Sequence, residues 1–167
     1  SVLVNNAGVL DQEGRLEDFS AERIARIIDL NVTGALLCAR EAIRCMSTAN
    51  GGEGGAIVNI SSMAATLGGG ATYLDYATSK GAIDTLTIGL SREVAREGIR
   101  VNGIRPGIIE TDIHASGGNP TRAVDLADTV PMGRAGTPQE VAEAVLWLAS
   151  DKASYVTGAT INVSGGR

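Results

Sequence analysis

The chain has 167 residues, a length that suits one domain with its own hydrophobic core. Its residues are 44% hydrophobic but only 3% aromatic, with 22 glycines, which favours an aliphatic parallel sheet covered by helices over an aromatic-rich β-sandwich. The formal charge of −5 argues against a nucleic-acid partner, and no apolar run predicts a membrane span or a signal peptide, so we expect a cytoplasmic protein.

The amino-terminal third predicts one strand and two helices. The apolar run Val2–Val4 is typical of a strand, and Asn5-Asn6-Ala7-Gly8 is typical of the turn that follows one. After a serine suited to the N-cap position, apolar residues at helical spacing predict helices over residues 21–30 and 32–46. Asn31 lies between these helical runs, where an asparagine can mark a kink or bind a water molecule.

The middle of the chain predicts a strand–helix–strand unit. A glycine-rich break leads into a strand over residues 56–60, which ends in Ser61-Ser62. An apolar stripe predicts a long helix over residues 76–97, and the glycine directly after it is a typical helix stop. A third strand follows over residues 99–104 and is closed by Arg105-Pro106-Gly107.

The last third predicts a long connection, a helix and a strand. Residues 108–130 show no strong periodicity and are long for a connection in a compact domain, so we expect residues 111–130 to form a lid over a site. A threonine N-cap followed by proline predicts a helix over residues 137–150, and residues 160–163 predict the last strand. Because strands and helices alternate, we predict that residues 1–167 form one α/β domain with a parallel sheet.

Tyr76 and Lys80 make the sharpest local signal in the sequence. They are spaced i and i+4 on the predicted helix, so their side chains share one face. A free tyrosine, with a pKa of about 10, is a poor acid or base at neutral pH, and a nearby ammonium lowers that value. The pair could therefore act as a tuned proton donor or acceptor, but a packed tyrosine beside a snorkelling lysine would give the same spacing.

Polar and small residues also follow the predicted strands, where ligands of α/β sheets gather. The Ser62 hydroxyl could hydrogen-bond a substrate oxygen, or it could serve only as a turn or helix cap. Ser61 is the neighbouring alternative, and strand alternation sends the two side chains in different directions. Small residues at 7–8 and 106–107 would let a flat ligand approach the backbone closely, unless they serve only the turns.

The cysteines and the single histidine predict neither a disulfide nor a metal site. Cys38 and Cys45 are separated by a helical rise of roughly 10 Å, too far for a disulfide, so we interpret them as core or interface thiols. His114 is the only histidine, and no cluster has metal-ligand spacing. In the predicted lid His114 could contact substrate, or it could be a solvated loop residue.

Short motifs follow one another along the chain: Asn5-Asn6-Ala7-Gly8, Leu30-Asn31-Val32, Ile60-Ser61-Ser62, Tyr76-x-x-x-Lys80, Arg105-Pro106-Gly107 and Gly158-x-x-Ile161-x-Val163-x-Gly165-Gly166. Each is weak alone, but the ordered series resembles the short-chain dehydrogenase/reductase family, in its shorter single-domain branch, over essentially the whole chain. The resemblance implies a Rossmann-like, doubly wound parallel sheet. This chain would be its carboxy-terminal part, strands four to seven with their flanking helices.

The resemblance also implies residue roles. Tyr76 would be the general acid/base, Lys80 would lower its pKa and hold the nicotinamide ribose hydroxyls, and Ser62 would polarise the substrate carbonyl or alcohol. Asn31 would anchor a water molecule in a proton relay through Lys80. The residues implied to contact the NAD or NADP cofactor are Asn5, Ala7, Gly8, Asn31, Tyr76, Lys80, Pro106, Gly107, Ile109 and Thr111.

One motif of the family has no counterpart here. The glycine-rich dinucleotide fingerprint is missing, since the run Gly51-Gly52-Glu53-Gly54-Gly55 precedes a strand instead of opening a helix. The residue that separates NAD from NADP is missing as well. We therefore expect two to three β–α units, roughly 60–90 residues, to lie upstream in a complete enzyme.

The set Asn31, Ser62, Tyr76 and Lys80 predicts an NAD(P)-dependent oxidoreductase that moves hydride between the cofactor and a small alcohol or carbonyl substrate. The missing amino-terminal half favours the alternative, a non-catalytic truncated remnant that acts only in oligomerisation or binding. A third reading is non-redox work such as dehydration or epimerisation. The resemblance further implies a homo-oligomer, a tetramer or a dimer, with the helices at 32–46 and 76–97 packed across one interface.

Overall fold

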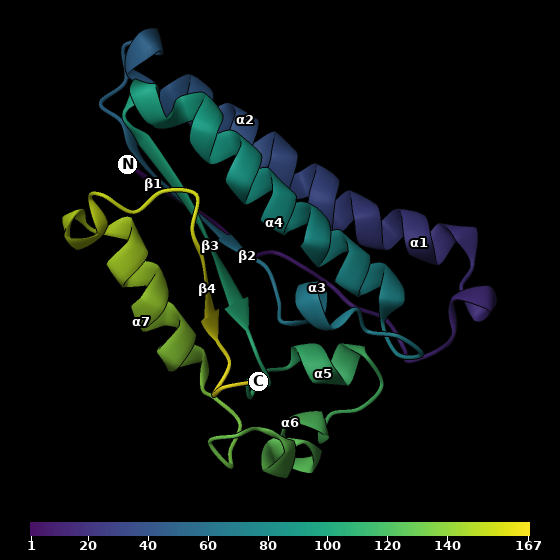
Figure 1. The fold of residues 1–167 in the computed structure, drawn as a ribbon. Helices are drawn as coiled ribbons and strands as arrows, with labels where there is room; N and C mark the ends of the chain where they lie inside the picture. Colours follow the sequence, from purple (N-terminus) through teal and green to yellow (C-terminus); the bar gives the residue numbers. More distant parts are fainter.

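The computed structural model describes residues 1–167, which form a four-stranded sheet with helices on both faces (Figure 1). The strands are β1 (Val2–Asn5), β2 (Gly55–Ile60), β3 (Ile99–Pro106) and β4 (Thr160–Val163). They lie in the order β1-β2-β3-β4, and every neighbouring pair is parallel. The predicted α/β class is confirmed, and all four predicted strands form.

The helices follow the predicted order, with several short additions. They are α1 (Ala21–Ile28), α2 (Gly34–Met46), α3 (Ala64–Leu67), α4 (Leu74–Val94), α5 (Ile113–Ser116), α6 (Arg122–Asp125) and α7 (Pro138–Ala149). A π-helical turn over Asp29–Thr33 joins α1 to α2 in one continuous rod, at the position where Asn31 predicts a kink. None of the helices combines the length and the apolar character needed to span a membrane.

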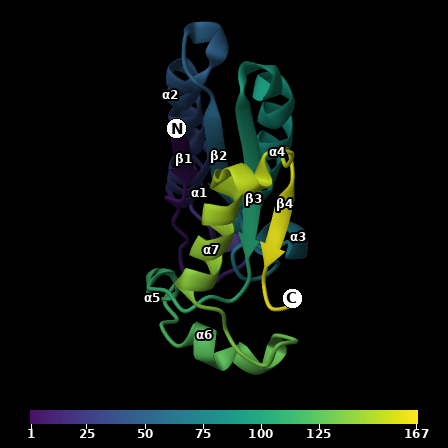
Figure 2. The same cartoon turned by 90° about the vertical axis from the view of Figure 1, so that its left-hand side faces the viewer.

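The sheet separates two hydrophobic layers. On one face, α2 and α4 pack against Ile57, Ile99 and Val101, all nearly inaccessible to solvent. On the other face, α7 covers Val58 and Ile104. Figure 2 shows α7 in front of the strands and the paired helices behind them. This alternation of side chains along each strand produces the doubly covered sheet that the composition predicts.

Residues 111–130 lie beyond the carboxyl ends of the strands, as Figure 1 shows for α5 and α6. Each of these helices has 4 residues, and a 3-10 turn follows over Ala127–Thr129. A single helical turn is too short to produce a periodic pattern, which explains why the sequence predicts only an irregular connection here. This segment forms one wall of the cavity described next.

Candidate active site

A cavity of about 600 Å³ lies at the carboxyl ends of the strands, within the volume range of small-molecule sites. It brings together residues that are distant in the sequence: Gly8 after β1, Ser62 after β2, Tyr76 and Lys80 on α4, and Pro106, Gly107, Ile109 and Thr111 after β3. Parallel strands produce this convergence because their carboxyl ends meet at one edge of the sheet. Eight of the predicted site residues therefore share one cavity.

An ion pair fixes the first turn of α4, which carries Tyr76. The Asp75 carboxylate is buried and accepts two hydrogen bonds from Arg23 of α1, Nε to Oδ2 at 2.7 Å and Nη2 to Oδ1 at 3.2 Å. Asp75 Oδ1 also accepts from the Tyr76 backbone N–H at 2.9 Å. Asp75 thus anchors the backbone of Tyr76, a role that the sequence pattern did not reveal.

The Tyr76 phenol is neutral at physiological pH. Burial raises its pKa, because removing water disfavours the phenolate, and the neighbouring Ser62 hydroxyl acts in the opposite direction. The Ser62 hydroxyl also accepts a hydrogen bond from the Ala64 backbone N–H at 3.1 Å, so it caps the start of α3 while lining the cavity. The two side chains therefore lie side by side, a phenol with an available proton beside a hydroxyl.

Lys80 is buried, with its ammonium bound to the end of β2. Its Nζ donates to the Ile60 carbonyl at 2.8 Å and lies over the Tyr76 ring, 5.6 Å from the ring centroid. Burial lowers the pKa of Lys80 to about 8. Burial raises the pKa of the Tyr76 phenol, so the lowered value that the resemblance implies is not found in this structure.

Asn31 holds the turn after β1 rather than lining the cavity. Its Oδ1 accepts from the Val9 N–H at 2.8 Å, and its Nδ2 donates to the Val9 carbonyl at 2.9 Å and to Ser79 Oγ at 3.0 Å. Both amide hydrogens are thus engaged, and the residue is 1% exposed. The side chain therefore has no free N–H to donate to a water molecule, and the relay through Asn31 stays a prediction.

Besides Asn31, two more of the residues implied to contact the cofactor lie outside the cavity wall. Asn5 Nδ2 donates to Asn59 Oδ1 at 2.9 Å, and Asn59 in turn donates to Thr87 Oγ1 at 3.0 Å, so these side chains tie β1, β2 and α4 together. Ala7 is exposed on the turn after β1. Asn6, which the sequence analysis did not select, lines the cavity instead.

The cavity wall suits the nicotinamide end of a dinucleotide. A Cβ added to Gly8 would lie 3.2 Å from Lys80 Nζ and 3.4 Å from Asn31 Oδ1. A larger residue at this position would therefore crowd the ammonium, whereas glycine leaves the space beside it open to a ligand. The ammonium donates only one hydrogen bond within the protein, to Ile60, and therefore keeps donors for ribose hydroxyls. By this test Gly8 and Lys80 fit the cofactor that the motifs imply.

The lid contributes polar residues that sequence reasoning did not resolve. His114 is 8% exposed, its Nε2 lies 2.8 Å from the Ile109 carbonyl, and it lines the cavity, so a solvated loop histidine is ruled out. Arg122 of α6 forms an ion pair with Glu13, which also accepts from the Tyr73 hydroxyl at 3.0 Å. These contacts join the lid to both neighbouring loops, and no spacing in the sequence indicates them.

Cys38 and Cys45 do not lie in the core. Both are free and exposed on α2, so the core half of the thiol interpretation is wrong. Nor do any three His, Cys, Asp or Glu side chains gather as metal ligands would. The polar groups that line the cavity include the Tyr76 phenol, the Lys80 ammonium, the Ser62 hydroxyl and the His114 ring.

Comparison with known proteins matches the whole chain. The family model described as enoyl-(acyl carrier protein) reductase matches residues 1–167. An uncharacterised oxidoreductase of Escherichia coli (strain K12) is 57% identical over 167 residues, which are 100% of this chain and 68% of the relative. A 3alpha-hydroxysteroid dehydrogenase of Mediterraneibacter gnavus is 41% identical, over 98% of this chain and 63% of the relative.

A solved structure has the same fold. The crystal structure of 3-ketoacyl-(acyl-carrier-protein) reductase from Brucella melitensis, complexed with NADH, superposes with a TM-score of 0.92 at 32% identity. The alignment covers 100% of this chain and 67% of that chain. This chain thus spans about two thirds of the length of the proteins that it matches.

Proposed function

Because this chain belongs to the short-chain dehydrogenase/reductase family, we propose that it carries the catalytic part of an NAD(P)-dependent oxidoreductase acting on a secondary alcohol or the matching carbonyl compound. The observation that carries the proposal is the convergence of Ser62, Tyr76 and Lys80 on one cavity. The matched relatives are named for a hydroxysteroid and a 3-ketoacyl group, both of which fit this substrate class.

The bound nicotinamide supplies or accepts the hydride. In the reducing direction, the substrate carbonyl oxygen lies between Ser62 and Tyr76, and the Ser62 hydroxyl donates a hydrogen bond that polarises it. Tyr76 donates its phenolic proton to that oxygen as the carbon accepts hydride, so the products are an alcohol and a phenolate. The raised pKa of Tyr76 suits this direction because the phenol still holds its proton at neutral pH.

Lys80 has two functions in this proposal. With a pKa of about 8 its ammonium is mostly protonated at neutral pH, and it stabilises the phenolate that forms at Tyr76. Its unused N–H donors hold the nicotinamide ribose hydroxyls. Asn31 acts as a positioning residue, because it fixes Val9 and therefore the turn on which Gly8 lies.

We expect Tyr76→Phe to reduce hydride transfer by about 10²- to 10⁴-fold, because it removes the proton donor and leaves the ring in place. The assay follows the absorbance of the reduced cofactor with a panel of secondary alcohols and ketones, and calorimetry measures NAD⁺ and NADPH binding. Tyr155→Phe is the matched control, since Tyr155 is fully exposed. Unimpaired turnover by Tyr76→Phe would refute the mechanism.

A wild-type chain that binds neither cofactor and reduces no ketone would support the alternative, a non-catalytic remnant. The geometry favours the enzyme, because the phenol, hydroxyl and ammonium line the same cavity and Asp75 and Arg23 fix the helix turn that bears the phenol. A remnant without catalysis has no need for a buried lysine, whose ammonium costs folding free energy.

We also propose that the protein is a homo-oligomer that pairs through α2 and α4. A groove of about 830 Å³ runs between the outer faces of these helices, with apolar residues such as Leu36 and Leu86 along it. The groove is also lined by Arg40 and Arg44, both paired with Glu41 on α2, and by Glu93 on α4. A two-fold axis along the groove would bury its apolar residues against the same residues of a second copy.

A further inference from the structure

The Lys80 ammonium is buried without a direct ionic partner. The residue is 4% exposed, and its one hydrogen bond goes to the neutral Ile60 carbonyl. Burying a charge in this way is unfavourable unless an opposite charge lies close by. The proposed reaction nevertheless requires the ammonium, so the structure must supply a compensating charge from elsewhere.

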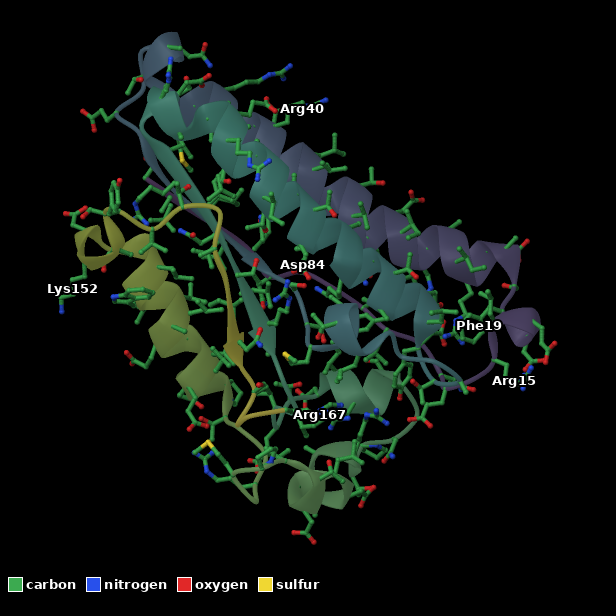
Figure 3. All side chains as sticks on the ribbon, in the orientation of Figure 1. Arg15, Phe19, Arg40, Asp84, Lys152 and Arg167 are labelled. Carbon is green, nitrogen blue, oxygen red and sulfur yellow. The ribbon has the colours of Figure 1, made fainter.

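Asp84 lies one helical turn beyond Lys80 on α4, on the side of the helix that faces the strands (Figure 3). Its Oδ2 accepts from Arg105 Nε at 2.9 Å, and the two side chains are only 13% and 21% exposed. Its Oδ1 is buried and bonded to no protein group. One oxygen of the carboxylate is therefore clamped by β3, while the other keeps its negative charge available to its surroundings.

We propose that Asp84, held in place by Arg105, is a positioning residue that supplies the counter-charge of the Lys80 ammonium. Residues spaced i and i+4 share one helix face, so the carboxylate and the ammonium lie within electrostatic reach of each other. Arg105 has two effects: it fixes the carboxylate against β3, and it neutralises part of its charge. The function of Lys80 in this scheme rests on the proposed oxidoreductase activity.

The other groups around Lys80 leave Asp84 as its counter-charge. On α4 the remaining titratable neighbours are Tyr76, a neutral phenol, and Asp75, which Arg23 of α1 neutralises. The loop after β2 and the π-helical turn place uncharged groups, Ser61 and Asn31, beside this part of α4, and Asp29 of that turn is exposed. Asp112, Arg122 and Arg167 line the same cavity, but Asp84 is the one charged group that shifts the pKa of Lys80. Consistent with this arrangement, burial lowers the pKa of Lys80 and Asp84 raises it.

The test is a nuclear magnetic resonance titration of the lysine side chains. The chain has only two lysines, Lys80 and the exposed Lys152 near the end of α7 (Figure 3), so ¹³Cε-labelled lysine gives one signal from the site and one internal reference. The titration is recorded without cofactor or substrate. Its result is therefore independent of whether the chain transfers hydride, which the Tyr76→Phe assay decides separately.

We expect Asp84→Asn to lower the pKa of Lys80 by about one unit, because it removes the nearby negative charge. Arg105→Gln should raise it, because the Asp84 charge is then no longer compensated. Both variants break the same ion pair, so a purely structural effect would move the pKa in the same direction in both. Opposite shifts therefore support the proposal, and equal or absent shifts overturn it.

Two further variants complete the design. Asp84→Glu keeps the negative charge and should leave the Lys80 titration within a few tenths of a unit of the wild type, roughly a third of the shift expected for Asp84→Asn. Glu53→Gln removes an exposed carboxylate from the loop before β2 and should leave the titration unchanged. If Asp84→Asn does not fold, Arg105→Gln decides: a raised pKa of Lys80 supports the proposal, and a lowered or unchanged one overturns it.

Discussion

The buried ammonium of Lys80, which lies over the Tyr76 ring, costs the folded chain stability. Its pKa of about 8, against an ordinary value of 10.5, means that the folded chain holds the proton less strongly than the unfolded chain does. Below about pH 8 both states are protonated, and the folded state bears the full cost of the buried charge. As the pH rises from about 8 to 10.5, that cost is relieved and the folded state gains stability.

We therefore expect Lys80→Met to stabilise the folded chain by about 2 kcal/mol at neutral pH, after subtraction of the lost Ile60 hydrogen bond. The gain should shrink as the pH rises through the interval above and give way near its upper end to a small loss, which is the missing Ile60 hydrogen bond. Urea unfolding at about pH 7 and about pH 10 measures both values. Lys152→Met, at an exposed position, serves as the control, and a loss of stability in Lys80→Met at neutral pH would contradict the expectation.

At the scale of elements, the glycines of the loop before β2 look alike in the sequence, but their backbone contacts in the structure differ. Gly51 and Gly54 both adopt positive φ angles, +85° and +77°. A Cβ added to Gly51 would meet nothing within 4 Å, whereas one added to Gly54 would lie 2.4 Å from the Gly98 carbonyl oxygen. This close contact lies where β2 and β3 begin, at the edge of the sheet opposite the cavity, and Gly55 pairs there with Ile99.

These two glycines form a matched pair for mutagenesis. Gly51→Ala should cost about 1 kcal/mol, the strain of a left-handed alanine, and Gly54→Ala should cost at least about 2 kcal/mol more because a backbone oxygen cannot move away cheaply. Chemical denaturation of both variants provides the comparison. Equal losses would show that the loop relaxes around the new methyl group and that the contact with Gly98 does not constrain it.

The helix α7 shows the opposite case, an element set by local sequence alone. Thr137 accepts a hydrogen bond from the Glu140 N–H at 3.3 Å, and Glu140 accepts from the Thr137 N–H at 2.8 Å, which together make a capping box with Pro138 at the first position. Arg134 binds the same carboxylate and, with the cap, lowers the pKa of Glu140 to about 2. Because that pKa is depressed, the cap persists as the pH falls and is lost only near pH 2.

At the scale of the whole molecule, the cavity and the groove between α2 and α4 lie on different parts of the surface. The cavity lies at the carboxyl ends of the strands, with residues such as Thr111 and His114 in its wall, whereas the groove between α2 and α4 lies on the outer surface along both helices. Leu36 is 47% exposed in this groove, an unusual position for leucine beside other apolar residues in a monomer. The surface proposed for pairing is therefore distinct from the cavity proposed for the reaction.

We expect Leu36→Glu to shift the protein toward the monomer, because it places a carboxylate in the groove where the second copy would pack. Light scattering after size-exclusion chromatography measures the mass. Leu16→Glu, at a residue 53% exposed and remote from the groove, should leave the mass unchanged. A wild-type chain that is already monomeric over the full concentration range would remove the basis for the proposed pairing.

The sequence by itself determined the elements whose signals are local. Apolar runs located all four strands, the stripe on α4 placed Tyr76 and Lys80 on one face, and Thr137-Pro138 marked the start of α7. It also determined the family, because the order of the motifs along the chain can be read without knowing which residues are in contact. Single-turn helices such as α3 and α5 escaped detection, since four residues show no period.

Only the tertiary structure decided which side chains face one another. It buried His114 and engaged both amide hydrogens of Asn31 in hydrogen bonds to Val9 and Ser79. It also paired Asp84 with Arg105, which is 21 residues away in the sequence. It also reversed the expected direction of the Tyr76 pKa shift. Hydrogen bonds, ion pairs and desolvation depend on distances between distant segments, and those distances are set by how the strands order in the sheet, which no local pattern encodes.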